Sequence, residues 1–529
     1  MQSAKRVIKN TGFLYGKMII TILISLYSTR LILNALGEVD YGIFYLVGGV
    51  IALLSFINGA MVIATQRYFG ISLGAGDIQK LKAVFSSGVI LHLIISLIIV
   101  LVLEITGIFL FSGFLDIPPE RIYTAKVIFQ FMIVSTFFTI NAVPYDASIN
   151  AHENMLFDAL LGIFEAVIKL GIAIWLVYEK GNKLILYGLL IAGLTILIRI
   201  IKGIYCHKKY EECRTHIKSY IQVGLLKEML AFAGWSVFGL FCSVLKSQGL
   251  SILLNLFFGI VVNAAYGIAT TVNANLSHFS TNMIRAIMPQ ITKSEGGGNR
   301  ERMLRLSVLA SKMSFFLLAF FAIPLILEMP FVLKVWLKTV PDNTVIFCQL
   351  ILIINLLYQL TVGTMAAVTS VGKIKSFQIA VGAVEIFNLP LAFILIKLGL
   401  PAYYVFINSI FLEIVAGGFR LWFAHKITGL DIKDFLVKTW LASILSAGVA
   451  VLIALLIRFL LQEGFLRAIL VGITTSLSLV LMVKYLVLTS EENERINETL
   501  LSFYNSFKNK LIRHKLPDYI ESGENEDTY

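Results

Sequence analysis

A chain of 529 residues that is 58% hydrophobic and only 14% charged is not an ordinary soluble protein, because globular domains are roughly 45–50% apolar and about 25% charged. Its mean hydropathy is +0.84, and its apolar runs are long enough to cross a bilayer, which takes about 20 helical residues. The composition therefore predicts an all-α polytopic membrane protein. The 44 basic residues outnumber the 32 acidic ones, but they are dispersed among loops, which argues for contact with anionic lipid and against nucleic-acid binding.

Apolar segments divide the chain into about fourteen predicted membrane spans. Six lie near 12–35, 42–66, 84–111, 123–148, 156–178 and 184–205. Six more lie near 229–257, 263–290, 306–329, 344–369, 376–399 and 402–424, and two follow near 438–461 and 465–488. We therefore expect an N-terminal lobe at 1–206, a cytoplasmic linker at 207–227, a C-terminal lobe at 228–426 and an added pair of spans at 437–488.

Loop charges predict the topology. Every second connection is basic, as at 67–82, 199–227, 285–312 and 420–438, so the positive-inside rule places both termini in the cytoplasm. After the last span, residues 489–529 are expected to form a cytoplasmic interfacial helix (Glu491 to Leu516) followed by a disordered acidic tail.

One span, 263–290, differs from the others because nearly half of its positions are polar. On a helix, one stripe is apolar and consists of Ile268, Val272, Leu276, Phe279, Met283 and Ile287. The opposite face holds Asn263, Tyr266, Thr270, Asn273, Ser277, Thr281 and Arg285. Unsatisfied polar groups are costly in lipid, so we expect this face to line a polar cavity. A surface-lying helix, or packing against another polar helix, are the alternatives.

The sequence also contains an internal repeat. The segments LILNALGEVDYGI (31–43) and LLNLFFGIVVNAAYGI (253–268) share Leu-Asn, then Gly, then Tyr-Gly, and GAGDIQKL (74–81) matches GGGNRERM (296–303). An even number of spans separates the two copies, so both halves run in the same direction. This predicts two parallel six-helix lobes related by an axis along the membrane normal.

These features resemble the bacterial polysaccharide flippases, the Wzx-type O-antigen and capsule transporters of the polysaccharide transporter family. That family belongs to the larger group that includes the MATE drug exporters and the lipid II flippase. The resemblance rests on the fourteen spans, the Tyr-Gly pair that enters the polar span, and MPQITKSEGGGNRERM at 288–303. It covers essentially residues 1–488.

The resemblance implies a V-shaped, MATE-like fold in the bacterial inner membrane, with a central cavity lined by the first, second, seventh and eighth spans. It also implies alternating access that moves an undecaprenyl-diphosphate-linked oligosaccharide to the outer leaflet. The glycan would be an O-antigen (lipopolysaccharide), capsule or exopolysaccharide repeat unit. Besides membrane lipids, the implied partners are the polysaccharide polymerase and the chain-length machinery.

Such a cargo carries a diphosphate and many hydroxyl groups. Cations within the relevant spans are the candidates for phosphate: Lys17, Arg30, Lys246 and Arg285. Amides and hydroxyls of the polar span are the candidates for sugar: Asn263, Thr270, Asn273, Ser277 and Thr281. Lys17 and Arg285 lie near span ends, so snorkelling towards the membrane surface is the alternative for them. Arg67, also at a span end, is expected to contact lipid headgroups.

Carboxylates bear on ion coupling. Glu165 and Lys169 are four residues apart and are expected to pair. Glu385 and Glu413 have no partner at helical spacing, and the second lobe of related flippases can hold a cation site. We therefore assign coupling to a proton or sodium ion to these two residues.

No catalytic motif, cofactor site or metal site is predicted, so we do not expect an enzyme. GGGNRER lacks the lysine of a phosphate-binding loop, which argues against an ATP-driven pump. Two other functions remain open. A cation-coupled MATE-type small-molecule exporter would need carboxylates in the cavity. A membrane polymerase or ligase would need a large extracytoplasmic loop, which the chain lacks.

Overall fold

The computed structural model describes residues 2–114, 118–337, 339–488 and 493–494, and their regular structure is entirely helical. The first series of helices is α1 (Gln2–Leu53), α2 (Ser55–Gly74), α3 (Ile78–Phe109), α4 (Ile122–Asn141), α5 (Val143–Ala151), α6 (Met155–Tyr178) and α7 (Lys183–Lys209). The second is α8 (Val223–Phe258), α9 (Ile260–Gly296), α10 (Arg300–Leu337), α11 (Thr344–Gln359), α12 (Val362–Val371), α13 (Lys375–Lys397) and α14 (Tyr404–Thr428). The short α15 (Ile432–Phe435) precedes α16 (Ala442–Leu460) and α17 (Phe465–Met482). A helix satisfies its own backbone groups, which lipid demands, and the expected all-α polytopic class is confirmed.

The number of spans agrees with the sequence once two exceptions are understood. Among the described residues, eleven helices are long and apolar enough to cross a membrane, or twelve if α11 and α12 form one span bent by 43°. The other two expected spans are helical as well but fail this test for separate reasons. The span at 263–290 lies within α9 and is too polar, and the span at 42–66 is interrupted at Leu54 between α1 and α2.

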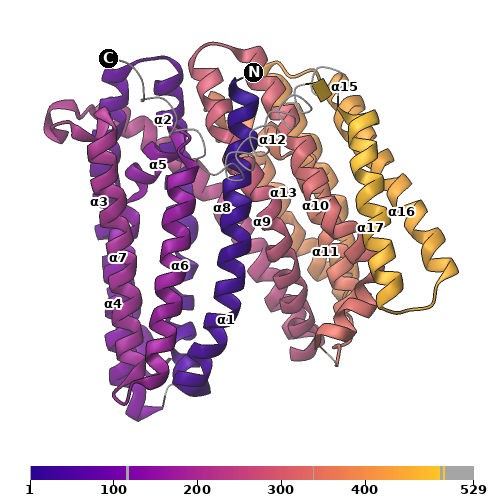
Figure 1. The fold of residues 1–529 in the computed structure, drawn as a ribbon, viewed down its shortest axis with the longest axis horizontal. Helices are drawn as coiled ribbons and strands as arrows, with labels where there is room; N and C mark the ends of the chain where they lie inside the picture. Colours follow the sequence, from indigo (N-terminus) through magenta and orange to yellow (C-terminus); the bar gives the residue numbers. More distant parts are fainter. Residues whose placement is uncertain (1, 115–117, 338, 489–492, 495–529) are drawn as a thin grey trace, which may run out of the picture.

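The helices form two lobes that meet at one end. In Figure 1, α1–α7 lie on one side and α8–α14 on the other, and the lobes diverge away from the end where α1 begins. Contacts between the lobes are made by α1 with α9, by α2 with α8, α9 and α12, and by α3 with α8. We call the end that contains residues 10–18 of α1 and 279–296 of α9 the closed end, because the hydrogen bonds described below join the lobes there.

Two pairs of glycines show the internal repeat in the backbone. Gly37 breaks α1 with φ 78° and ψ 168°, and Gly259 separates α8 from α9 with φ 83° and ψ 178°. Gly76 and Gly298, at the second repeated motif, have φ values of 69° and 72°. Positive φ is accessible to glycine at little cost. The two repeated motifs therefore make the same turns at equivalent places.

The last two helices are attached to α10. An apolar cluster joins α16 and α17 to Phe315, Ala319 and Ile323, and Lys312 Nζ donates to the Val487 carbonyl over 3.0 Å. At the other end of α10, Arg467 Nη2 lies 2.8 Å from the buried Glu328 carboxylate. These helices therefore extend the second lobe and do not contribute to the boundary between lobes.

The connection at 207–227 is more ordered than the sequence indicated. α7 continues to Lys209, two 3₁₀ turns follow at Glu211–Arg214 and Ile217–Tyr220, and α8 begins at Val223 instead of near 229. The turns pack on α3. The predicted interfacial helix and acidic tail lie almost entirely outside the described residues.

Candidate functional site

The helices at the boundary between the lobes are basic and lack carboxylates over most of their length. Residues 10–37 and 42–74, in α1 and α2, contain no Asp or Glu, and the same holds for 229–258 and 260–294, in α8 and α9. The same four segments carry all the predicted phosphate-binding cations: Lys17, Arg30, Lys246 and Arg285. These helical segments are therefore net positive before any neighbouring group is considered.

The polar face of α9 is divided between structural contacts and exposure. Asn355 Nδ2, on α11, donates to Asn273 Oδ1 (2.7 Å) and to Ser277 Oγ (2.8 Å). Ser251 Oγ donates to Asn263 Oδ1 over 2.8 Å. Three of the five predicted sugar contacts are thus already hydrogen-bonded to α8 or α11. For these three residues, the alternative of packing against another polar helix therefore holds.

The exposed edge of α9 is turned about the helix axis, by about one residue, from the predicted centre of the polar face. Its polar members are Thr271, Asn275, His278 and Thr281. Thr270 is half-buried, and its hydroxyl donates to the Gly267 carbonyl over 2.9 Å. Asn275 did not stand out in the sequence, since the exact orientation of a helix depends on its neighbours. The apolar stripe packs inward, where Phe279 stacks on Phe321 with centroids 4.1 Å apart.

The four predicted cations occupy two levels. Lys17 and Arg285 lie at the closed end, where both reach Asp158, on α6. Arg30 is about 20 Å farther along α1, at 1.5 Å per residue, and is exposed. Lys246 is half-buried on α8. Among the described residues, neither Arg30 nor Lys246 has a hydrogen bond or ion pair.

At the closed end, hydrogen bonds join the lobes. Arg285 Nη2 lies 3.3 Å from Asp158 Oδ2, and Lys293 Nζ lies 2.6 Å from Glu153 Oε1. Gln290 also donates to Glu153, whose side chain is buried and whose φ is 59°. In addition, Tyr15 Oη donates to the Phe279 carbonyl over 2.7 Å.

Arg67 makes another contact between the lobes, and its predicted role as a lipid-headgroup anchor is wrong. Its guanidinium donates to the carbonyls of Ser370 (3.2 Å) and Val371 (3.0 Å), at the end of α12. The last carbonyls of a helix have no partner within the helix, and a basic side chain satisfies them well. Gly372 follows with φ 91°, and a Cβ there would overlap the guanidinium.

The second lobe contains a separate buried polar cluster away from the boundary. Glu413 pairs with Arg420, two helical turns later on α14, so its expected lack of a partner at helical spacing is wrong. Arg420 also donates to Thr361 Oγ1 over 3.2 Å and lies 4.9 Å from the Tyr358 ring centroid. Glu385 acts electrostatically on Arg420, yet its Oε2 is buried and has no hydrogen-bond partner among the described residues.

The predicted pair Glu165–Lys169, on α6 of the first lobe, is confirmed at 2.7 Å.

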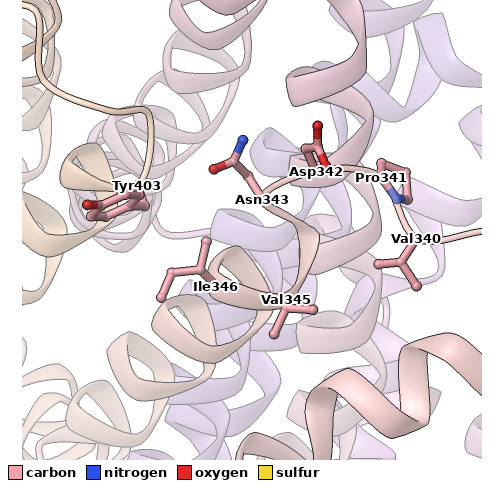
Figure 2. Close-up of a pocket in the computed structure, with 7 residues that line it drawn as sticks. All are labelled: Val340, Pro341, Asp342, Asn343, Val345, Ile346 and Tyr403. Atoms are coloured by element: carbon pink, nitrogen blue, oxygen red, sulfur yellow. The ribbon is translucent and has the colours of Figure 1, made fainter.

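A surface depression lies on the second lobe, outside the boundary. Figure 2 shows its lining where the turn before α11 meets the start of α14, with Asn343, Ile346 and Tyr403 around it. Its volume is about 480 Å³ and its walls are mainly apolar. None of the predicted binding residues lines it.

No family model matches the sequence, and a comparison with curated proteins gives no match. Solved structures do match. An outward-facing multidrug-resistance MATE family transporter of the MOP superfamily has a TM-score of 0.71 and 13% identity, covering 81% of this chain and 96% of that one. A MOP superfamily transporter from Pyrococcus furiosus, described as having a binding pocket of reversed polarity that suggests a different function, has a TM-score of 0.68 and 13% identity, covering 82% and 97%. A MATE in the straight conformation has a TM-score of 0.67 and 15% identity, with the same coverage.

These similarities define the fold. The chain has the two-lobed helical fold of MATE-like transporters, and the added α16 and α17 follow the two lobes, α1–α7 and α8–α14. Identities of 13–15% establish the architecture alone, so the cargo must be inferred from the residues at the boundary.

Proposed function

We propose that this protein is a flippase that moves an undecaprenyl-diphosphate-linked oligosaccharide across the bacterial inner membrane by alternating access. The observation that carries the proposal is the charge at the boundary between the lobes. Six lysine and arginine side chains and no carboxylate lie in the four helical segments named above, and four of the six are the predicted phosphate-binding cations. A diphosphate is the chemistry that such a surface attracts, because cations bind phosphate oxygens by charge-assisted hydrogen bonds.

The unpaired cations are the strongest candidates for the phosphate. Arg30 is exposed and Lys246 half-buried, and neither has a partner among the described residues. An unpaired cation within a membrane span is costly, roughly 2.5–3.5 kcal/mol on insertion scales, and is retained for function by default. We assign sugar contact first to the exposed edge of α9, and after it to Asn263, Asn273 and Ser277, whose existing hydrogen bonds a sugar would have to replace.

The conformation fits one half of a transport cycle. If the loop charges orient the protein with its termini in the cytoplasm, the closed end faces the cytoplasm and the lobes diverge towards the outside. One solved structure of similar fold is likewise in an outward-facing conformation. Cargo from the cytoplasmic leaflet would then enter after the contacts at the closed end break.

Ion coupling is assigned to the cluster in the second lobe. Glu385 presents a buried oxygen that has no hydrogen-bond partner among the described residues, next to the ion pair Glu413–Arg420. A carboxylate in this position can take up a proton or a sodium ion, and α11 and α12 bend beside it. We therefore place coupling chiefly on Glu385.

The polysaccharide polymerase and the chain-length machinery remain the proposed protein partners.

Complementation of a flippase-deficient strain tests the proposal. Arg30→Ala, Lys246→Ala and Arg285→Ala should each lower the amount of surface polysaccharide at least fivefold at equal protein level. Arg305→Ala is the matched control, because Arg305 is an exposed cation that pairs only with Glu301 among the described residues, at 3.6 Å. Normal polysaccharide in all three boundary variants would show that the cationic surface does not bind the cargo.

A MATE-type exporter is the second candidate, and the structural similarities favour it. Two of the solved structures described above are MATE proteins. Export of organic cations requires negative charge along the path, whereas the boundary helices here carry none over the segments given above. The two candidates separate in one assay. Expression should leave resistance to cationic dyes unchanged if the first is correct, and should raise it severalfold if the second is correct.

A further inference from the structure

Asp158 is the centre of a charge cluster that crosses the boundary between the lobes. Its Oδ2 lies 3.1 Å from Lys17 Nζ and 3.3 Å from Arg285 Nη2, and its Oδ1 lies 3.3 Å from Lys202 Nζ. Lys17 and Lys202 belong to the same lobe as Asp158, whereas Arg285 comes from α9 in the other lobe. One carboxylate thus holds three cations, and one of the three must leave if the lobes separate at this end.

The sequence around the cluster allows this convergence. Lys17 crosses α6 at Gly162, where a Cβ would overlap the lysine Cε. Asp158 lies in the first turn of α6, one turn after the Glu153 that binds Lys293. The turn between α5 and α6 and the first turn of α6 therefore present one carboxylate each to α9, Glu153 and Asp158.

The cluster contains more positive than negative charge. Lys202 Nζ also lies 2.6 Å from Asp146 Oδ1, and Arg199 Nη1 lies 3.7 Å from Asp146 Oδ2. Four cations therefore face two carboxylates, which leaves two positive charges without an anion in the cluster. The carboxylate of Asp158 is 5% exposed, but the side chains of Lys17 and Arg285 are 24% and 40% exposed. An anion in solution can therefore reach Lys17 and Arg285, two of the cations that Asp158 holds.

We infer that Asp158 is an internal substitute for the anionic group of the cargo. With the closed end shut, the Asp158 carboxylate neutralises Lys17 and Arg285. When the lobes separate, Arg285 moves away with α9, and a phosphate takes the place of the carboxylate on Arg285 and Lys17. Return of Arg285 to Asp158 displaces the phosphate and closes this end again.

The exchange explains how binding of an anion is linked to opening. A ligand shifts a conformational equilibrium only by its different affinity for the two states. In the closed state Asp158 competes for the cations, and in the open state it cannot reach Arg285. A phosphate therefore binds the open state more tightly. This inference deepens the proposed function and depends on it for the identity of the cargo. The exchange of anions on Arg285 and Lys17 does not depend on it.

The experiment compares three neutralised carboxylates in the purified full-length protein in nanodiscs. Asp158→Asn removes the substitute anion and a contact between lobes. Glu153→Gln weakens a contact between lobes without touching the cluster. Asp146→Asn removes a carboxylate from the same cluster without touching α9. All four cysteines are buried, so labels on Gln79→Cys and Glu301→Cys, both exposed, report the distance between lobes at the closed end. The probe ligand is inorganic pyrophosphate.

Asp158→Asn should raise the population with the longer distance about tenfold without ligand, and should lower the Kd for pyrophosphate about tenfold. Glu153→Gln should also raise the population with the longer distance. Its Kd for pyrophosphate should fall only as far as this larger open population explains. Asp146→Asn should leave the distance unchanged. Arg285→Ala should open the closed end and weaken pyrophosphate binding.

Two results would overturn the inference. If Asp158→Asn keeps the normal distances and the normal Kd while melting at the same temperature as Asp146→Asn, the carboxylate is neither a latch nor a substitute anion. If it opens the closed end but binds pyrophosphate no more tightly than Glu153→Gln, it is a latch alone. Should the distance and binding results hold while complementation fails for the normal protein, the exchange stands and the cargo is a different anion.

Discussion

Gly74 and Gly296 lie against each other's helices where α2 and α9 cross. A Cβ on Gly74 would overlap the carbonyl oxygen of Lys293, and a Cβ on Gly296 would overlap the carbonyl oxygen of Ile71. The two glycines occupy equivalent places in the internal repeat, since GAGDIQKL begins at Gly74 and GGGNRERM begins at Gly296. The two copies of the repeat thus meet at the closed end, with backbone against backbone.

Alanine at either glycine should therefore weaken the closed end. Gly74→Ala and Gly296→Ala place a methyl group against a carbonyl that cannot move without bending its helix, and overpacking of this kind costs about 1–3 kcal/mol. The labels at residues 79 and 301 should report a larger open population in both variants. Gly203→Ala on α7, where nothing lies within 4 Å, is the control. Equal distances in all three variants would show that the crossing adapts freely.

The attachment of the last two helices depends on Glu328. Its side chain is 2% exposed, and it lies 2.8 Å from Arg467 and 3.6 Å from Arg458. Glu328→Gln leaves the buried Arg467, which is 10% exposed, with only the more distant and more exposed Glu463 carboxylate (3.9 Å) as a charge partner among the described residues. Removing one member of a buried pair costs about 3–5 kcal/mol, so thermal unfolding in detergent should occur at a clearly lower temperature. Glu301→Gln, at an 83% exposed carboxylate, should not change the unfolding temperature.

The linker between the lobes should loosen in acid through Glu212. Burial acts to raise the pKa of this carboxylate, but hydrogen bonds from His152 (2.9 Å) and Ser148 (2.6 Å) outweigh it and leave the pKa below its usual 4.5. A lowered pKa in the folded state stabilises the attachment above pH 4.5, and this stabilisation is lost as pH falls through the lower value.

Hydrogen exchange of residues 210–222 measures this effect. Exchange should accelerate as the pH is lowered from about 5 towards 3, after correction for the intrinsic rate. Glu212→Gln should exchange faster at pH 7 and should show less acceleration. A linker that exchanges with the same pH profile in both proteins would rule out the carboxylate as the cause.

Glu385 and Glu413 should respond differently to neutralisation. Glu413→Gln leaves Arg420, whose side chain is 1% exposed, without its counter-charge and should lower the unfolding temperature. Glu385→Gln removes no hydrogen bond from Oε2 and should leave stability nearly unchanged, while transport loses its dependence on an ion gradient. Transport by the normal protein that persists after both proton and sodium gradients are collapsed would contradict the coupling role.

The sequence by itself determined the class and the plan of this protein. Long apolar runs dictate helices in lipid because no water is present to satisfy the backbone. The repeated motifs, separated by an even number of spans, predicted two halves that run in the same direction, and the glycines of both copies adopt positive φ in the structure. Glu165 and Lys169 could be paired from their spacing alone, since four residues bring side chains together on a helix.

Tertiary structure alone decided which polar groups are used within the protein and which remain available. Asn273 and Ser277 looked like cavity residues, but Asn355, distant in sequence, binds both. Arg67 looked like a lipid anchor, but the end of α12 lies beside it. The same is true of Asp158, which is one acidic residue on a helix until three cations from three other helices converge on it. Helical periodicity gives the direction of a side chain about its own axis, whereas the neighbour it meets depends on how the lobes pack.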